Sequence, residues 1–592
     1  MNDMKKVPDL SELTLDFHNG QLFMRWQEAD LPDNARLRVW RSREKITVDN
    51  LAGAELLADM LNPGSARDWW RDPASFVVPR DETLKSEEIF AGNVADTGTS
   101  PQLAKGWVLK DDAPPISPAG GLHVHTPESG GTFYYAVSWH SGEAEKAEFL
   151  LTADEPVTVA PGKAEIIRIA GNTGRSGTAG LPMIVYLHGR EGGIGVDKNG
   201  EPCGTHLLFT DTSLAWREGI PVKFAVEVTD TFDGRKASEK FVKLTLFDRI
   251  WIGRPLTDKE SNDPRDHVPA VNTFWMGYHT DIARGCFAPY FWDNYTEKLV
   301  MYIIDLVQEK FATDPNRLYL AGGSMGGTGA VHLSMHFPNR FAAALAWVPV
   351  YRYSWAETAG FPQLAPSIER MRCTIGLFSP DDPVISPDGR ELRKYGDAVR
   401  FISDPTVDMP PLFATNGRRD MSIPWVNNPP FFTAAEKAQQ ALRVIWNNGG
   451  HGMTGEVEEV VTPDELLSYR LDKPFAAFSN NSDNCDYGSG DPADGDLYGW
   501  LNRGLAVGTV EESDKTVMVE LSAGHAEMDF PVTCDVTIRR RKLFKPVPGT
   551  HLQCRIDGAE VPDCIVNENG LLTVKNITFS KPGKITLFLS QR

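Results

Sequence analysis

The 592-residue chain shows three successive patterns of apolar and polar positions. From about residue 10 to 159, apolar and polar residues alternate in short segments bounded by Pro, Asp and Gly. Alternation with a period of two is typical of antiparallel strands that bury one face. The clearest examples are residues 21–26, 36–41 and 132–137. We therefore predict an N-terminal β-sandwich over residues 1–160, interrupted by a helix at residues 49–61.

The pattern changes near residue 180, where wholly apolar runs begin to alternate with long amphipathic segments. Such alternation is typical of a parallel sheet whose strands are buried on both faces. It predicts an α/β domain over residues 161–477, with a helix at residues 295–311. The apolar runs predicted as strands are 183–187, 317–321, 342–347, 411–415 and 442–446.

The last part of the chain begins with a polar stretch at residues 478–497. Asn, Ser, Gly and five aspartates dominate it, and this composition predicts an acidic linker or surface loop. The aspartates leave a calcium site open, although their spacing does not match an EF-hand loop and lacks its final Glu. Alternating strand patterns return over residues 498–592 and predict a second β-sandwich.

Charge and composition narrow the classes of partner. The formal net charge of −20 opposes binding to the phosphates of nucleic acid. The apolar stretch at 341–350 is about half the length of a membrane span, so we expect no membrane association. No apolar run follows Lys5 and Lys6, so these residues show no signal peptide. The location stays open, with a secreted or periplasmic protein as the named alternative. The pattern leaves the oligomeric state open.

The seven cysteines contain no CxxC pair, which argues against a zinc cluster and against a disulfide framework. Cys554 and Cys564 fit either a hairpin disulfide or two buried thiols. No motif of the chain calls for a metal or another cofactor.

The sharpest chemical signal is the GxSxG element at residues 322–326, which follows an apolar strand and opens a segment of small residues. In that context the serine stands on a tight turn between strand and helix, with its hydroxyl exposed above the sheet edge. The flanking glycines remove the Cβ atoms that would clash there. Ser324 is therefore the candidate nucleophile.

A serine hydroxyl needs a general base, and the base needs a group that orients it. Asp420 follows the apolar run at 411–415, and His451 follows the run at 442–446 inside a glycine-rich loop. Both would lie at the carboxyl ends of strands, in the order Ser, Asp, His of α/β-hydrolases. Asp381 and Asp382 also follow an apolar run, but they precede a long charged stretch and fit a lid or insertion better.

The tetrahedral intermediate of such a reaction needs hydrogen-bond donors aimed at its oxyanion. The backbone N–H of Met325 is the first candidate. The second comes from the glycine-rich turn after the strand at 183–187, where we favour the N–H of Arg190 and keep that of Glu191 as the alternative. His188 in the same turn is expected to hydrogen-bond loop backbone rather than to act in catalysis.

These segments support a resemblance to a known family. The sequences at 187–189, 314–317 and 322–327, with Asp420 and Gly450-His451-Gly452, resemble the α/β-hydrolase esterases grouped with polyhydroxybutyrate depolymerases and feruloyl esterases. The resemblance covers about half of the chain and implies a metal-independent serine esterase with an acyl-enzyme intermediate. The flanking strand patterns resemble fibronectin type III or immunoglobulin-like sandwiches in architecture only.

The expected function is hydrolysis of esters, such as feruloyl or acetyl groups on polysaccharides, or of polyester chains. The aromatic residues Trp275, Tyr278, Trp292 and Trp425 are candidates for lining the substrate cleft, but core packing is the favoured interpretation for Trp275, Tyr278 and Trp292 and an equal one for Trp425. Two other functions remain open. A prolyl-oligopeptidase-like peptidase shares the order of the three residues, although no propeller repeat precedes them, and a non-catalytic glycan-binding protein would leave them unused.

Overall fold

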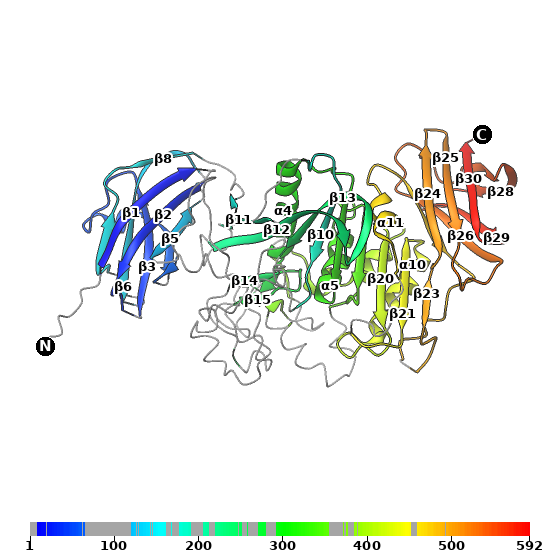
Figure 1. Cartoon of the computed structure of the whole chain (residues 1–592), viewed down its shortest axis with the longest axis horizontal. Coiled ribbons are helices and arrows are strands. Elements are labelled where there is room, and N and C mark those ends of the chain that lie inside the picture. The colour runs from blue at the N-terminus through cyan, green and yellow to red at the C-terminus, as the bar shows by residue number, and fades with distance from the viewer. Residues whose placement is uncertain are drawn as a thin grey trace. The chain divides into compact units, whose positions relative to one another are not determined.

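Figure 1 shows the computed structural model of the chain. The described residues form two compact units, residues 1–173 with 193–227, and residues 174–192 with 228–592. The structure describes residues 9–18, 21–32, 34–61, 63–65, 120–125, 127, 129–141, 144, 146–160, 167–168, 177–190, 205–211, 220–246, 248–251, 257, 270–279, 292–353, 371, 374–376, 384–386, 389–451, 459–491 and 493–591.

The first unit consists of antiparallel strands, as its alternating pattern predicts. One sheet has the order β1-β2-β5, and a second has the order β4-β3-β6-β7, with β8 paired to β6. Leu22 and Trp26 of the first sheet and Val39 and Val137 of the second enter one buried cluster. The strands are β1 (Asp9–His18), β2 (Gln21–Ala29), β3 (Ala35–Ser42), β4 (Glu55–Leu61), β5 (Gly121–His125), β6 (Gly131–Ser141), β7 (Phe149–Thr152), β8 (Val157–Val159), β9 (Ile167–Arg168) and β11 (Thr205–Asp211).

The helix predicted at residues 49–61 is wrong. A short 3-10 turn, η1 (Leu51–Gly53), leads instead into strand β4, which pairs with β3. Arg41 forms a bidentate pair with Glu55, and Arg38 lies 2.5 Å from Asp59 across the same two strands. The Glu, Leu, Ala and Met of this segment favour a helix locally, but cross-strand pairing and burial against β3 outweigh that preference.

The second unit contains the predicted α/β sheet. From β23 the order is β21-β20-β19-β18-β10-β13-β12, and the six strands from β21 to β13 are parallel. β23 pairs with β21 in the antiparallel sense. The strands are β10 (Met183–Leu187), β12 (Ile220–Phe232), β13 (Arg235–Leu246), β18 (Leu318–Gly323), β19 (Ala343–Trp347), β20 (Leu412–Gly417), β21 (Leu442–Asn447) and β23 (Gly499–Leu501).

Helices cover both faces of this sheet, which explains why its central strands are apolar throughout. Leu466 and Leu467 of α11 join Ile184, Tyr319 and Phe413 in one buried cluster. On the other face α5 packs against β10, β18 and β19, and α9 contacts both α5 and α10. The helices are α4 (Tyr295–Phe311), α5 (Met325–His336), α8 (Leu392–Tyr395), α9 (Ala398–Ile402), α10 (Pro429–Lys437) and α11 (Pro463–Ser468).

Short two-stranded pairs complete the α/β part near α4. β14 pairs with β15, and β16 pairs with β17, in both cases in the antiparallel sense. Their bounds are β14 (Arg249–Trp251), β15 (Ala270–Asn272), β16 (Tyr278–His279) and β17 (Trp292–Asp293).

The C-terminal strands form two further sheets, with the orders β22-β26-β29 and β24-β25-β30-β27-β28. Side chains of both sheets enter one buried cluster. β22 already belongs to this part, so its residues pair outside the α/β sheet although we placed them at the end of the α/β domain. The strands are β22 (Phe475–Ser479), β24 (Leu505–Glu512), β25 (Thr516–Ala523), β26 (Val532–Arg539), β27 (His551–Ile556), β28 (Ala559–Ile565), β29 (Leu572–Phe579) and β30 (Gly583–Gln591).

The stretch predicted as an acidic linker packs on the α/β part. The indoles of Trp446 and Trp500 donate to the carbonyls of Asp496 and Asp483, at 2.9 and 2.8 Å. Immediately after the stretch, β23 extends the α/β sheet beyond β21. Its Asp and Gly residues build no core of their own, but their carbonyl groups accept hydrogen bonds from buried indoles of the neighbouring sheet.

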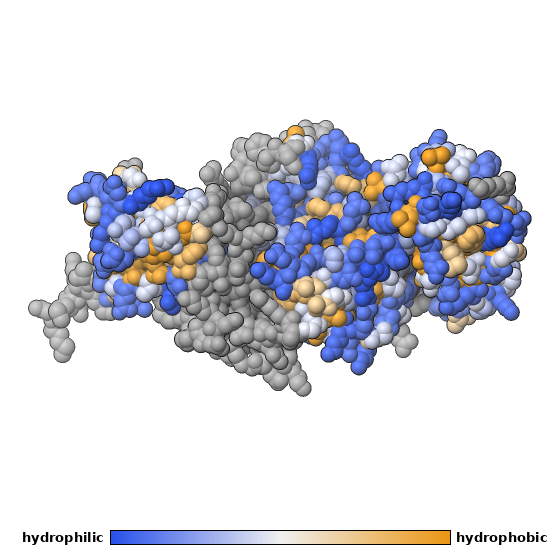
Figure 2. Space-filling view, turned by 90° about the horizontal axis from the view of Figure 1, so that it is seen from above, coloured by the Kyte–Doolittle hydropathy of each residue, from blue (hydrophilic) through white to orange (hydrophobic). Residues whose placement is uncertain are grey.

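Surface and cysteine chemistry add three observations. Figure 2 shows one face covered mainly by hydrophilic residues, with apolar residues in small patches. Within the described residues, no helix combines the length and apolar character of a membrane span. Cys554 and Cys564 are both buried and are not joined by a disulfide.

Two arginines at the end of β26 connect the C-terminal sheets to the α/β sheet. Arg540 is buried, and its guanidinium donates to the carbonyls of Phe341, Ala342 and Arg470 at 3.1–3.3 Å. Arg539 donates to the carbonyl of Pro405 at 3.1 Å. Burial lowers the pKa of Arg540 to about 10, so the side chain stays charged at neutral pH.

We therefore expect Arg540→Met to lower the free energy of unfolding of this unit by about 2–4 kcal/mol, because three buried carbonyls lose their donor. Arg555→Met is the control, since the Arg555 side chain is 41% exposed and pairs with the exposed Glu560; its cost should stay within about 0.5 kcal/mol. Guanidinium chloride unfolding followed by tryptophan fluorescence measures both. Equal midpoints for the two variants would contradict the expectation.

Candidate active site

The strand-to-helix turn predicted around Ser324 is present. Ser324 lies between β18 and α5 with φ 56° and ψ −120°, a backbone conformation that is rare for a residue with a side chain. The N–H of Ser324 donates to the carbonyl of Trp347 at 2.8 Å, and the N–H of Thr328 donates to the carbonyl of Ser324 at 2.9 Å. These bonds fix the serine at the start of the helix with its side chain partly exposed.

Close backbone packing explains the glycines of this turn. A Cβ atom at Gly326 would lie 1.9 Å from the carbonyl oxygen of Leu187, and one at Gly322 would lie 2.4 Å from that of Gly326. No side chain fits at such distances. The chain therefore needs glycine at both positions to place the turn against the end of β10.

Asp420 and His451 approach Ser324 from the ends of β20 and β21. Nδ1 of His451 lies 2.7 Å from Oδ2 of Asp420, and Nε2 of His451 lies 2.7 Å from Oγ of Ser324. With the imidazole neutral and its proton on Nδ1, the ring donates to Asp420 and accepts from the serine hydroxyl. The three residues that the sequence separates widely thus form one hydrogen-bonded chain.

Hydrogen bonds with backbone groups hold the Asp420 side chain and the loop of His451 in place. Oδ1 of Asp420 accepts the N–H groups of Ser422 and Ile423 at 2.7 and 2.9 Å, which leaves Oδ2 for the imidazole. The N–H of Arg419 donates to the carbonyl of Gly449 at 2.8 Å, so the two loops are joined. The carboxylate is buried, whereas the imidazole is 35% exposed and is therefore accessible from solvent.

The loop after β10 lies directly against the turn of Ser324. A Cβ atom at Gly189 would lie 3.7 Å from that of Ser324. The His188 ring hydrogen-bonds the carbonyl of Gly189 through Nδ1, at 2.6 Å, and the N–H of Asp248 through Nε2, at 3.0 Å. The expectation that His188 bonds backbone is confirmed. Glu191, the alternative oxyanion donor, lies outside the described residues, as do Asp381 and Asp382.

The structure also places the two predicted oxyanion donors near the serine. Met325 begins α5, and the N–H groups in the first turn of a helix have no partner within the helix. Arg190 follows Gly189 in the loop that packs against Ser324. Assignment of these two N–H groups as oxyanion donors remains a prediction.

The aromatic residues predicted to line a substrate cleft are core residues instead. Trp275 and Trp425 are 1% exposed, Tyr278 is 6% exposed and Trp292 is fully buried. Trp275 packs on α5, where a Cβ atom at Gly329 would lie 2.6 Å from its ring. Trp425 stacks under Arg418, and its indole donates to the carbonyl of Tyr487 at 3.0 Å. Buried aromatic rings are used here for packing, which the sequence pattern could not distinguish from a cleft.

A support that the sequence did not predict lies next to the acid. Arg418, two residues before Asp420, donates to the carbonyls of Tyr487 and Asp494. These carbonyls belong to the stretch expected to be a solvated linker. Burial lowers the pKa of Arg418, and the nearby carboxylates, Asp494 foremost, act in the opposite direction. The stretch at 478–497 therefore supports the Asp420 loop through its hydrogen bonds with Arg418.

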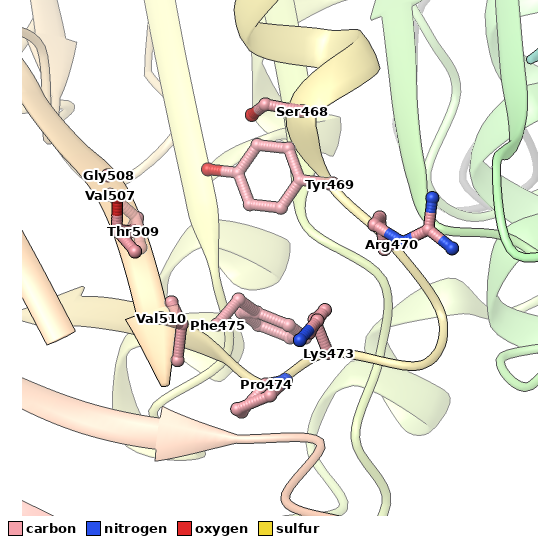
Figure 3. A pocket seen from close by; sticks show the side chains of 10 residues that line it. All are labelled: Ser468, Tyr469, Arg470, Lys473, Pro474, Phe475, Val507, Gly508, Thr509 and Val510. Carbon is pink, nitrogen blue, oxygen red and sulfur yellow. The ribbon is translucent and has the colours of Figure 1, made fainter. Parts of the chain in front are cut away.

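A hollow of about 200 Å³ lies elsewhere, between α11 and β24 (Figure 3). Its lining residue Arg470 lies near the amino end of β18, because the N–H of the next residue, Leu471, donates to the carbonyl of Asn316 there. Ser324 stands at the carboxyl end of the same strand, so this hollow is separate from the candidate active site. Its lining residues are Ser468, Tyr469, Arg470, Lys473, Pro474, Phe475, Val507, Gly508, Thr509 and Val510.

In the part of the chain that the structure describes, no group of three or more His, Cys, Asp or Glu residues is arranged to hold a metal ion. The aspartates of the 478–497 stretch instead accept backbone N–H groups, as Asp486 does from Gly488 and Asp491 from Ala493. These contacts are turn hydrogen bonds rather than a coordination sphere.

A parallel sheet with a serine on a strained strand-to-helix turn is the architecture of the α/β-hydrolases. Residues 224–461 match the family model Esterase, described as "Putative esterase". This part of the chain is therefore similar to the esterase family of serine hydrolases. The match does not single out the polyhydroxybutyrate depolymerases or the feruloyl esterases. Among curated proteins, none matches the chain significantly.

Several solved structures are similar to part of the chain. An S-formylglutathione hydrolase from Agrobacterium tumefaciens is 14% identical, with coverage of 56% of this chain and 91% of that chain and a TM-score of 0.28. The carboxylesterase Cest-2923 from Lactobacillus plantarum is 13% identical, with coverage of 53% and 90% and a TM-score of 0.25. An acylaminoacyl peptidase from Pyrococcus horikoshii is 11% identical, with coverage of 56% and 48% and a TM-score of 0.28. At such TM-scores these likenesses do not bear on function.

The packing of the nucleophile turn makes a direct prediction. Gly326→Ala should push the turn away from the carbonyl of Leu187, at a cost of about 1–3 kcal/mol, and misplace the serine enough to lower hydrolysis of p-nitrophenyl acetate at least ~100-fold. Gly524→Ala is the matched control, because nothing lies within 4 Å of a Cβ there. Thermal unfolding and initial rates measure both. Wild-type rates in Gly326→Ala would show that the turn tolerates a side chain.

Proposed function

We propose that the chain is a carboxylic-ester hydrolase in which Ser324 is the nucleophile, His451 the general base and Asp420 the residue that orients the base. The single observation that carries this proposal is the continuous hydrogen-bonded chain from Asp420 through His451 to Ser324, with 2.7 Å at each link. Such a chain raises the reactivity of an otherwise inert hydroxyl. The match of residues 224–461 to the esterase family model supports the ester as the bond that is cleaved.

In the first half of the reaction, Oγ of Ser324 attacks the ester carbonyl carbon while His451 takes the hydroxyl proton. The carbonyl oxygen becomes an oxyanion, which the N–H groups of Met325 and Arg190 would stabilise by about 3–4 kcal/mol each. Collapse of the intermediate breaks the C–O bond, and His451 returns the proton to the departing alcohol. Ser324 then carries the acyl group as an ester.

In the second half, His451 takes a proton from water, and the resulting hydroxide attacks the acyl carbon. The second tetrahedral intermediate expels Oγ of Ser324, which recovers the proton from His451, and the carboxylic acid leaves. Asp420 keeps the ring oriented and stabilises its positive charge in both halves. All the groups that this cycle requires are side chains and backbone groups of this chain.

We propose further that the ester belongs to a bulky substrate, such as an acylated polysaccharide or a polyester. This proposal is supported by the two all-β parts that accompany the α/β part, which we interpret as β-sandwich modules that hold such a substrate. Burial of the predicted cleft aromatics removes one argument for a feruloyl group, so acetyl and polyester substrates stand beside it as equal alternatives.

Replacement of the nucleophile tests the reaction. Ser324→Ala should lower kcat/KM for p-nitrophenyl acetate by at least about 10⁴-fold, because no other group can form the acyl-enzyme. Ser334→Ala is the control, since Ser334 lies on the same helix and its hydroxyl bonds only the helix carbonyl of Val331. Turnover that survives in Ser324→Ala would remove Ser324 from the mechanism.

A substrate panel tests the class of bond and of substrate. Methyl ferulate, acetylated xylan, polyhydroxybutyrate and polyethylene terephthalate oligomers should include one ester that is hydrolysed well above the others, and a peptide p-nitroanilide should not be cleaved. Release of acid, measured by titration and chromatography, ranks the substrates. Cleavage of the anilide faster than every ester would identify a peptidase instead, and no turnover of any compound would favour a non-catalytic role.

A further inference from the structure

One buried carboxylate has no part in the proposed mechanism but lies close to residues 188–190, the loop after β10, which we call the oxyanion loop. Asp248 follows β13 and is 1% exposed. Its carboxylate accepts the N–H of Thr273 at 3.0 Å and also the hydroxyl of Thr273. We propose that Asp248 is a positioning residue for the oxyanion hole, acting through the turn 273–275 and His188. This inference rests on the proposed function of Ser324.

The turn that Asp248 holds is strained. Phe274 and Trp275 have φ values of 55° and 61°, so two successive residues with side chains adopt the left-handed conformation. Such a conformation is unfavourable for a residue with a side chain unless the surroundings compensate it. The backbone N–H groups of Thr273, Phe274 and Trp275 all interact with the Asp248 carboxylate. Successive N–H groups that converge in this way form an anion-binding nest, and here the anion is a side chain of the same chain.

The turn at 273–275 and the preceding Asn272 donate hydrogen bonds to two carbonyl groups of the oxyanion loop. The indole Nε1 of Trp275 donates to the carbonyl of His188 at 3.2 Å, and Nδ2 of Asn272 donates to the carbonyl of Arg190 at 3.1 Å. The rings of Trp275 and His188 also pack edge to face, 5.2 Å apart. Any shift of the turn would therefore move this loop.

Peptide geometry carries the effect to the N–H groups. In a trans peptide the N–H points opposite to the C=O of the same unit. The carbonyl of His188 is held by Trp275 and that of Gly189 by the His188 ring, so the directions of the next two N–H groups, those of Gly189 and Arg190, are both fixed. Asp248 completes the arrangement, because its own N–H donates to Nε2 of His188 and sets the tautomer of the ring.

Protonation of Asp248 should make the reaction rate depend on pH, which a purely structural role of this residue would not do. Burial raises the pKa of Asp248 to about 7, against the effect of its hydrogen bonds. Among the described residues, the titratable groups that face it are His188 from the β10 loop and Tyr353 from the segment after β19, and Tyr353 is in turn influenced by Glu297 of α4. Below this pKa the carboxylate gains a proton and holds the nest less strongly, and above it the full negative charge is present.

The test compares Asp248→Asn with Asp397→Asn. Asp397 is the matched control because burial raises its pKa too and it accepts a backbone N–H, that of Val399, but it caps α9 instead of the turn. Two rates are measured from pH 5.5 to 9: hydrolysis of p-nitrophenyl acetate, and phosphonylation of Ser324 by a tagged fluorophosphonate, in which Oγ displaces fluoride. The second rate needs the oxyanion hole but no ester substrate.

We expect Asp248→Asn to lower kcat and the phosphonylation rate together, by about 10–100-fold at pH 8, with KM changed less than threefold. Asp397→Asn should keep both rates within twofold. The rise of the wild-type rates with pH should be steeper than that of Asp248→Asn, since one ionisation is removed. Trp275→Phe, which lacks the donor to the His188 carbonyl, should lower both rates and add little to Asp248→Asn in the double variant.

The outcomes separate the two proposals. If no ester is hydrolysed but wild type is phosphonylated faster than Asp248→Asn, the ester function fails and the role of Asp248 stands. If Asp248→Asn matches wild type in both rates and in pH profile, the role of Asp248 is wrong whatever the substrate is. A loss confined to the fraction of molecules that can be labelled, at unchanged rate for the remainder, would assign Asp248 to folding alone and overturn the proposal. Failure of wild type to be phosphonylated would overturn both.

Discussion

The close approach of two backbone segments is the constraint on which the rest of the site depends. The end of β10 packs so tightly on the turn after β18 that only hydrogen atoms fit at Gly322 and Gly326. That contact holds Ser324 at a positive φ that it would not adopt in a free peptide. It also brings the loop of Gly189 against the serine, so the nucleophile and the candidate oxyanion donors are positioned by one and the same packing interaction.

Around this contact the fold uses backbone groups far more than side-chain pairs to fix geometry. The Asp420 carboxylate is oriented by the N–H groups of Ser422 and Ile423, and the Asp248 carboxylate by the turn at 273–275. A carboxylate held by several N–H groups has little freedom to rotate. Asp420 is thus held where it bonds His451, and Asp248 is held where it bonds the turn that contacts the loop after β10.

The stretch at 478–497 shows how composition and context can diverge. Its Asp, Asn and Gly residues cannot form a core, and the sequence correctly implies that they stay near the surface. Carbonyl groups of the stretch nevertheless accept hydrogen bonds from the α/β part: that of Tyr487 from Trp425 and Arg418, and that of Asp496 from Trp446. The sequence did not predict this packing, and the only hint it carried was the set of indole and guanidinium groups in the α/β part, each of which needs an acceptor when buried.

The sequence by itself determined the parallel sheet and the three residues at its edge. A wholly apolar run needs burial on both faces, and a residue placed just after such a run must stand at the carboxyl edge of the sheet, where Ser324, Asp420 and His451 meet. These signals are local in the chain, and therefore they can be read without coordinates.

Only the tertiary structure decided the identity of β4, the burial of Trp275, Tyr278 and Trp425, and the partners of Asp248. In each case the outcome depends on what lies across from the residue. Residues 55–61 favour a helix until β3 offers a pairing edge, and an indole is a cleft wall or a core residue according to its neighbours. Such contacts join segments that are far apart in the sequence. They therefore produce no local period of apolar and polar residues from which they could be predicted.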